Sequence, residues 1–218
     1  QLLDPQPFTG EGAGEAGEGS DAPVMITVPG TWSEHMPVLG MATYRLRVKV
    51  GDTGATYGLK TSSVQMSNRI IVNGRVVGES GVPSEKGRHE TANRPYTGYF
   101  TLQPGWNEII VHAANHEFPA GSGVNEPIYF GLAGQISALR DKALTHDWIS
   151  VTAFLIMGLY FMGLYSQRRN DVSLLVLGMV CVFLALFTST RGERVLYLTL
   201  GNVPFWLFLR IQLLTAIC

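Results

Sequence analysis

The sequence predicts an all-β sandwich followed by an α-helical transmembrane region. All five histidines, every lysine and all but two of the 17 acidic residues precede Trp148, whereas Leu, Val, Phe, Met and Gly dominate the rest. Short alternating or β-branched runs fill the first part, and long charge-free runs fill the second. We therefore expect residues 1–139 to fold in water and residues 148–218 to lie in lipid, with a linker at 140–147.

The charge balance argues against nucleic acid as a partner. The formal net charge is −1, and acidic residues outnumber basic ones before Trp148. A domain that neutralises phosphates needs a basic surface instead. Cysteine usage does not indicate the compartment, because no cysteine precedes Cys181. The chain starts at Gln1 and stops at Cys218 within an apolar run, so we expect it to be part of a longer protein.

Eight runs in the first part have the composition of β-strands. Each alternates in polarity or is rich in β-branched residues, and turn-forming residues separate one run from the next. The predicted strands are 24–28, 42–50, 55–61, 69–72, 76–79, 96–102, 107–113 and 128–132. Short strands at this spacing are typical of an antiparallel sandwich or barrel.

Two local patterns support antiparallel pairing. Asn73 and Gly74 separate two β-branched runs, and this dipeptide favours a tight hairpin turn because both central residues take positive φ. In the run 43–50, alternate residues from Tyr44 are apolar and alternate residues from Arg45 are basic. One face of that strand is therefore expected to face the core and the other to face water.

Residues 10–21 differ from these runs. Their sequence, GEGAGEAGEGSD, is acidic and glycine-rich and contains no apolar side chain larger than alanine. Because such a segment has little to bury, we expect a mobile loop.

The second part contains two complete candidate membrane spans and one incomplete span. Residues 148–167 and 172–190 carry no charge, and each would measure about 30 Å as a helix. A third apolar run, 203–218, is interrupted by Arg210. The alternative is a pair of buried helices in a soluble protein, although core helices are usually shorter. The four residues between the first two runs require an antiparallel hairpin.

The orientation of this hairpin follows from its short loop. Arg168 and Arg169 belong on the cytoplasmic side by the positive-inside rule, so the N-terminal domain is expected outside a multi-pass cell membrane protein. By the same rule, Arg191 and Arg194 would place the next loop on the cytoplasmic side. Charge alone therefore does not decide the orientation. The size and strand character of the first domain then favour the extracytoplasmic placement.

Four segments together resemble a known domain. The order VPGTW (28–32), TYRLRV (43–48), IIVNGRVVGESG (70–81) and LQPGWNEIIVHAANH (102–116) is similar to the galactose-binding-like jelly roll, the non-catalytic sugar-binding domain of many β-galactosidases. The hairpin that follows, 158–194, is absent from those enzymes. The combination resembles the bacterial seven-transmembrane receptors with diverse intracellular signalling modules, and this resemblance covers nearly the whole chain.

The resemblance implies a membrane receptor with an extracytoplasmic jelly-roll sensor, seven helices and a cytoplasmic output such as a diguanylate cyclase, histidine kinase, phosphatase or nucleotide cyclase. The chain stops in the third helix, so no output module is visible. The sequence contains no HExxH, CxxC, P-loop or GxSxG motif and no evident glycosidase carboxylate pair. The visible residues are therefore not expected to form an enzyme, and no catalytic residue is assigned.

The predicted ligand site lies on loops at one end of the sandwich. Its residues are Trp32, Arg88, His89, Asn115 and His116. Trp32 follows a Pro-Gly turn, where its ring could stack on a sugar; the alternative is that it closes the core. Arg88 and His89 lie in the long polar stretch 84–96, which is either functional or a solvated connection. Asn115, His116 and Glu117 end a strand and would form the opposite wall.

No cofactor and no transition metal are expected. His112 and His116 would leave the same face of a strand about 13 Å apart, too far to share one zinc ion. A structural calcium held by carboxylates and carbonyls is left open. The expected partners are a small-molecule or carbohydrate ligand, membrane lipid and, in a homodimer, a second copy of the chain. Two other functions remain open: a protein-interaction module of a membrane complex, and a non-catalytic sugar-binding domain of a membrane-anchored glycosidase.

Overall fold

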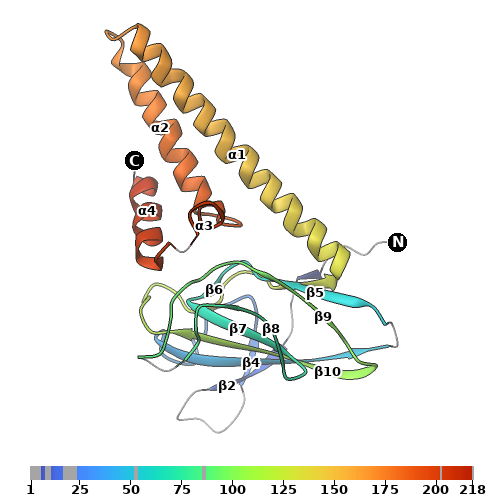
Figure 1. The fold of residues 1–218 in the computed structure, drawn as a ribbon. Coiled ribbons are helices and arrows are strands. Elements are labelled where there is room, and N and C mark those ends of the chain that lie inside the picture. Colours follow the sequence, from blue (N-terminus) through green and yellow to red (C-terminus); the bar gives the residue numbers. More distant parts are fainter. Residues whose placement is uncertain are drawn as a thin grey trace. The chain divides into compact units, whose positions relative to one another are not determined.

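The computed structural model describes residues 6–7, 11–16, 24–51, 54–84, 87–201 and 203–217. The chain divides into two compact units, Gln1–Arg140 and Asp141–Cys218. The first is built from strands and the second from helices (Figure 1). The boundary between the units falls inside the first helix.

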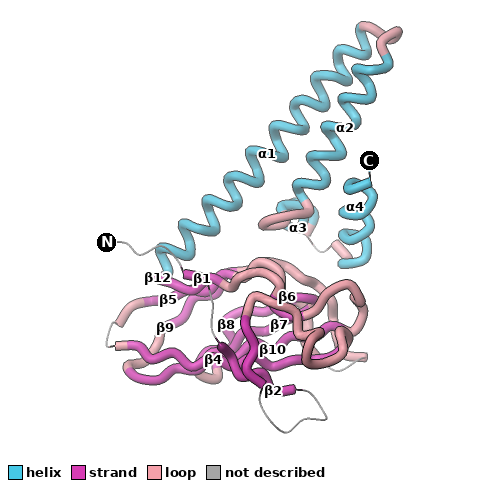
Figure 2. Tube along the Cα trace, turned by 180° about the vertical axis from the view of Figure 1, so that it is seen from behind, coloured by secondary structure: helices cyan, strands magenta, loops and turns pink. Residues whose placement is uncertain are grey.

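Among the described residues, the first unit contains two large antiparallel sheets and one small one (Figure 2). In spatial order, the six-stranded sheet consists of β3 (Val24–Thr27), β2 (Glu11–Ala16), β4 (Gly40–Val50), β10 (Gly105–Asn115), β7 (Ser67–Val72) and β8 (Arg75–Ser80). The four-stranded sheet consists of β1 (Gln6–Pro7), β12 (Tyr129–Leu132), β5 (Thr56–Lys60) and β9 (Thr97–Thr101). The third sheet pairs β6 (Val64–Gln65) with β11 (Gly123–Val124).

Both large sheets contribute to one hydrophobic core, which makes the unit a β-sandwich. Leu59 and Phe100 come from the four-stranded sheet, and Tyr44, Ile70 and Ile109 come from the six-stranded sheet. All are buried because alternate residues of a strand point to the same face. The predicted alternation from Tyr44 is confirmed, since Arg45 and the basic residues in register with it are exposed.

All eight predicted strands are present, with ends that shift by one or two residues. The predicted hairpin at Asn73 and Gly74 is also confirmed, because both take positive φ, 49° and 80°, and join β7 to β8. The expectation of a mobile loop at 10–21 is wrong for residues 11–16, which form β2 between β3 and β4. Strand pairing uses backbone groups, so a run of Gly, Ala and Glu can join a sheet without burying large side chains. Residues 10 and 17–21 lie outside the described part.

The two large sheets meet closely along one side of the sandwich, where β8 and β9 are edge strands (Figures 1 and 2). A Cβ at Gly98 would lie 2.3 Å from the side chain of Val77, and one at Gly78 would lie 2.3 Å from the ring of Tyr96. Both positions therefore require glycine. Burial raises the pKa of Tyr96 well above its usual range, and the protonated phenol donates to Asn68 Oδ1 at 2.7 Å.

The second unit contains the rest of α1 (Ala133–Gln167), then α2 (Val172–Ser189), α3 (Val195–Leu200) and α4 (Phe205–Ile217). The predicted spans at 148–167 and 172–190 correspond to the later part of α1 and to α2. The predicted linker 140–147 is helical and lies within α1, because nothing in that stretch breaks a helix. The short helix α3 was not predicted.

The α1 and α2 helices form a close antiparallel hairpin. A Cβ at Gly158 would lie 3.1 Å from the carbonyl oxygen of Gly178, and the reverse distance is also 3.1 Å. Small residues of this kind let two helix backbones approach. A hydrogen bond also connects α1 to the turn before α3: the backbone N–H of Glu193 donates to Asp147 Oδ2 at 2.8 Å.

By length and composition, α1 and α2 are long and apolar enough to cross a membrane. A core helix of a soluble protein can pass the same test, but such a helix is mostly buried. Here the apolar windows are only 11% and 22% buried within the structure.

Candidate ligand-binding site at one end of the sandwich

The structure places Trp32 in the core, which corrects its predicted role as an exposed stacking platform. Its side chain is 2% exposed, and its indole Nε1 donates to the carbonyl oxygens of Pro37 at 3.0 Å and Val38 at 3.3 Å. The turn after Pro29 directs the ring inward, where burying a large aromatic surface is favourable. Trp32 therefore closes the core, the alternative considered above.

Asn115 is also structural rather than exposed for a ligand. It is 0% exposed, and its Nδ2 faces the carbonyl oxygens of Val38, Phe118 and Gly121 at 3.2, 2.7 and 2.8 Å. Its Oδ1 accepts from the backbone N–H of Phe118 at 3.0 Å. With both ends of the amide occupied, Asn115 fixes the loop that follows β10.

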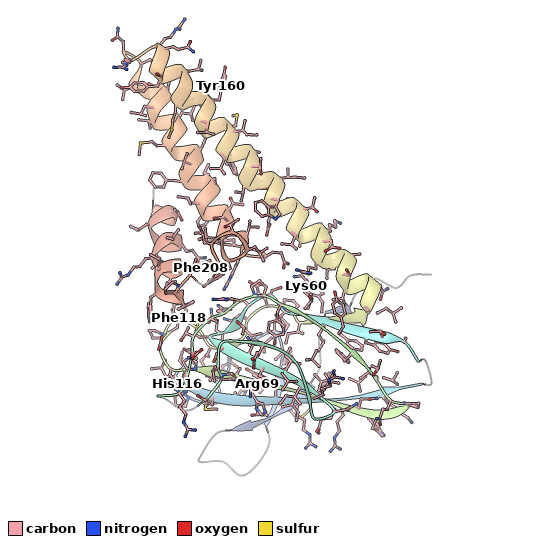
Figure 3. All side chains as sticks on the ribbon, in the orientation of Figure 1. Lys60, Arg69, His116, Phe118, Tyr160 and Phe208 are labelled. Carbon is pink, nitrogen blue, oxygen red and sulfur yellow. The ribbon has the colours of Figure 1, made fainter. Side chains whose placement is uncertain are left out.

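The other three predicted residues remain at the surface at this end. Arg88 is exposed, and His89 and His116 are partly buried. His89 and His116 are brought together from different segments, with ring centroids 5.0 Å apart and planes at 85°. Figure 3 shows His116 and Phe118 at the same end of the sandwich. The pairing of a residue from the loop after β8 with one after β10 is the geometry that the sequence predicted.

His89 is linked to a carboxylate through a hydroxyl. Thr91 Oγ1 donates to Glu117 Oε2 at 3.1 Å and lies 3.1 Å from His89 Nε2. Because the hydroxyl proton is used on Glu117, His89 Nε2–H is the donor to Thr91. The resulting chain runs from His89 through Thr91 to the exposed carboxylate of Glu117.

The other nitrogen of His89 faces inward. His89 Nδ1 lies 3.2 Å from Ser67 Oγ, which is also 3.2 Å from the carbonyl oxygen of Ala114. Ser67 donates its one proton to that carbonyl oxygen, and its hydroxyl oxygen lies against His89 Nδ1. Ser67 is 0% exposed, so this Ser-His pair cannot present a nucleophile to a substrate.

His116 is held by a separate contact. Its Nε2–H donates to the backbone carbonyl oxygen of Ser84 at 2.9 Å, which connects β10 to the loop after β8. The two histidines are thus oriented by different partners, and both ring positions are fixed by the surrounding protein.

The electrostatics favour the neutral form of His89 by lowering its pKa. Burial lowers the pKa of His89 first, the nearby His116 lowers it further, and the charge of Glu117 opposes both. The imidazole itself is occupied by these internal contacts, and the exposed carboxylate of Glu117 is the group of this chain of bonds that a hydroxyl-bearing ligand can reach.

Two members of this cluster, which we call the end cluster, were not among the five predicted site residues, namely Thr91 and Glu117. The end cluster consists of His89, Thr91, His116 and Glu117, with Ser67 and Ser84 supporting the rings, together with the exposed Arg88 next to His89 in the chain. Glu117 could be anticipated, since it was expected beside His116 in the opposite wall, and Thr91 lies in the polar stretch 84–96. Ser67 could not, because only strand pairing with β10 brings it near His89.

The described residues contain no group of three or more His, Cys, Asp or Glu side chains arranged to hold a metal ion. His89 and His116 already use the ring nitrogens described above on hydroxyl and carbonyl groups.

No protein-family model and no curated protein matches the chain. Solved structures are similar to part of it. A GH2 β-galacturonidase from Eisenbergiella tayi, bound to glycerol, is 17% identical over 60% of this chain and 24% of its own, with a TM-score of 0.45. A β-glucuronidase from Faecalibacterium prausnitzii is 14% identical over 58% of this chain and 31% of its own, also with a TM-score of 0.45.

A third similar structure, the β-glucuronidase of Ruminococcus gnavus, is 14% identical over 57% of this chain and 28% of its own, with a TM-score of 0.44. The chain thus spans less than a third of the length of each of these three enzymes. At these identities and TM-scores, the likeness assigns no function to the chain. The class that the structure itself defines is a β-sandwich followed by apolar helices.

Proposed function

We propose that this chain is the sensing and first membrane-spanning part of a multi-pass membrane receptor. Its β-sandwich, of the galactose-binding-like jelly-roll type, lies outside the cytoplasm and binds a small hydroxylated ligand such as a carbohydrate. The apolar helices pass the signal to a cytoplasmic output module that follows this chain. The receptor class and its output rest on the resemblance of the sequence to the bacterial seven-transmembrane receptors.

The observation that carries the proposal is the direct continuation of the sandwich into an apolar helix. Leu132 ends β12, and Ala133 begins α1, which continues without a break to Gln167. The side chains of Ile149, Ile156 and Leu159 on α1 are more than 60% exposed within the structure. Exposed apolar surface of this extent is unfavourable in water and favourable in lipid.

The start of α1 is anchored to the sandwich within the first unit. Ile136 is 0% exposed, and a Cβ at Gly58 of β5 would lie 3.1 Å from the Cβ of Ile136. A displacement of β5 or its neighbours therefore acts on the first turns of α1 without a flexible connection. This anchor supports a role in transmitting a signal rather than only tethering the domain.

The end cluster supports ligand binding by its chemistry. Arg88 and Glu117 are exposed, Arg88 next to His89 in the chain and Glu117 bonded to Thr91. Polar groups converging from two loops on a rigid sandwich are the usual construction of a binding site.

Cysteine labelling tests the topology. In a chain with Cys181→Ala and Cys218→Ala, Asn170→Cys in the α1–α2 turn should react with a membrane-impermeant maleimide only after spheroplasts are opened. Glu34→Cys, an exposed position on the sandwich, is the matched control and should react in intact spheroplasts. The reverse pattern would invert the orientation, and labelling of both in intact spheroplasts would exclude the span between them.

A further inference from the structure

A second candidate site, which we call the edge groove, lies where the two sheets end side by side. It has a volume of about 380 Å³ and is lined by residues of the β7–β8 hairpin on one side and β9 with its following turn on the other. Sites for small ligands commonly have about 300–1,000 Å³. The edge groove is built from different segments from those of the end cluster.

The walls of the edge groove are edge strands. β8 is the last strand of the six-stranded sheet, and β9 is the last of the four-stranded sheet. In an edge strand, alternate residues direct their backbone N–H and C=O away from the neighbouring strand. The groove walls therefore offer backbone donors and acceptors in addition to side chains.

The rim of the groove is held in place before any ligand arrives. Asn73 Nδ2 donates to Asn107 Oδ1 at 2.7 Å, and Asn73 Oδ1 accepts from the backbone N–H of Glu108 at 2.9 Å. Asn107 is 1% exposed and also bonds the backbone N–H and C=O of Gln103 at 2.9 and 2.8 Å. Both sides of the rim are thus fixed by one buried amide, which lowers the entropic cost of binding.

The lining determines the class of ligand. Arg75 is the one charged residue among the described residues that line the groove, and it is exposed. Thr101 and Gln103 supply neutral polar groups, while Val77 and Phe100 supply apolar surface. A guanidinium binds a carboxylate well, and neutral donors and acceptors suit hydroxyl groups.

One lining residue also contacts the strand that supports α1. A Cβ at Gly58 would lie 3.1 Å from Tyr99 Cδ1 and 3.1 Å from Ile136 Cβ, so both side chains pack over the same glycine. Tyr99 lines the groove, and Ile136 belongs to the second turn of α1. Tyr99 therefore connects the groove to the first turns of α1.

We propose that the edge groove binds a small hydroxylated carboxylate of the sugar-acid class, and that Tyr99 transmits its occupancy to α1 through Ile136. The binding site stands on the geometry of the groove alone. The transmission step rests on the receptor function proposed above.

Calorimetry on the full chain in lipid nanodiscs tests the site, with D-glucuronate as the probe and D-glucose as its neutral counterpart. Glucuronate should bind at least about tenfold more tightly than glucose, because only the acid gains a charge-assisted contact with Arg75. Arg75→Gln should remove that preference, and Arg75→Lys should restore part of it. Arg47→Gln, an exposed arginine on the outer face of β4, is the matched control and should leave binding unchanged.

Other outcomes would overturn the site. Absence of glucuronate binding, or binding that survives Arg75→Gln, would show that the groove is not an anion site. If His89→Gln abolishes binding while Arg75→Gln does not, the ligand occupies the end cluster, and the proposed function stands without the edge groove.

Hydrogen exchange tests the transmission step separately. Glucuronate should increase the protection of backbone amides at 133–140 against exchange in the wild-type chain. In Arg75→Gln, the ratio of protection with and without glucuronate should fall toward one. Unchanged protection at saturating glucuronate would overturn the coupling while leaving the site intact. Failure of the cysteine topology test would reject the receptor function without affecting either binding result.

Discussion

His89 and His116 meet edge to face at one end of the sandwich, with ring centroids 5.0 Å apart. One ring comes from the loop after β8 and the other follows β10. Each is oriented by its own hydrogen bond, His89 Nε2–H to Thr91 and His116 Nε2–H to Ser84. Protonating His89 places a positive charge in a partly buried position beside a second titratable ring, and this has a measurable consequence for stability.

The free energy of unfolding should rise with pH through the range where His89 loses its proton. Its pKa in the folded chain is lowered from 6.5, so just below pH 6.5 the unfolded chain binds more protons than the folded one. The contribution is full above pH 6.5 and is lost as the pH falls through the lowered value, with a slope of at most about 1.4 kcal/mol per pH unit. Urea denaturation at several pH values measures it.

The control for this pH dependence is a second histidine variant. His89→Gln should flatten the slope, whereas His35→Gln, at an exposed turn, should leave it as in the wild-type chain. Equal slopes in all three chains would mean that His89 is not held neutral by its surroundings.

Trp32 and Trp106 should respond oppositely to truncation. Trp32→Ala removes a side chain that is 2% exposed and should cost about 3–5 kcal/mol of stability. Trp106→Ala removes one that is 70% exposed and should change the free energy of unfolding by about 0.5 kcal/mol or less. Chemical denaturation followed by circular dichroism compares the two. Similar costs would contradict the core position of Trp32.

The loss of stability on substituting Asn115 should depend on the group that the new side chain places opposite the three carbonyl oxygens. Asn115→Ala leaves those carbonyls without the side-chain donor and should cost at least about 2 kcal/mol. Asn115→Asp should be worse, because an acceptor with negative charge then faces other acceptors in a buried position. The free energy of unfolding of both variants decides the order. A milder effect of Asp would show that the loop rearranges around the carboxylate.

Gly158 should be essential to the α1–α2 hairpin, whereas Gly163 should not. A Cβ at Gly158 would lie 2.9 Å from Val182 Cγ2 and 3.1 Å from the Gly178 oxygen, so Gly158→Leu should separate the helices at a cost of about 1–3 kcal/mol. Gly163 on the same helix has no atom within 4 Å of a Cβ, and Gly163→Leu is the matched control. Unfolding of the chain in detergent by titration with sodium dodecyl sulfate measures both. Equal loss in the two variants would argue against close contact at Gly158.

The strands were predictable because their signals are local. Alternation from Tyr44 and the Asn73-Gly74 turn depend on neighbouring residues only, and both are present in the structure. β2 was missed because its residues carry no periodic apolar signal; backbone pairing with β3 and β4 forms the strand. Residues 140–147 were predicted as a linker with no secondary structure assigned, and their helical structure was not anticipated because a polar stretch carries no apolar periodicity.

The site was predictable only in part. The sequence indicated that the loop after β8 and the end of β10 carry polar residues, and the structure brings His89 and His116 together there. It could not distinguish an exposed Trp32 or Asn115 from a buried one, since a residue next to a turn can face either way. The edge groove was also invisible, because it depends on two edge strands that lie far apart in the chain.

The sequence by itself determined eight of the strands and the two long apolar runs, because these follow from the period of hydrophobic residues and from run length. Tertiary structure alone decided that Trp32 and Asn115 are interior, that Thr91 joins His89 to Glu117, and that Tyr99 and Ile136 pack over Gly58. The physical reason is that local periodicity depends on residues a few positions apart. Burial and side-chain contact depend on which distant strands the fold brings together.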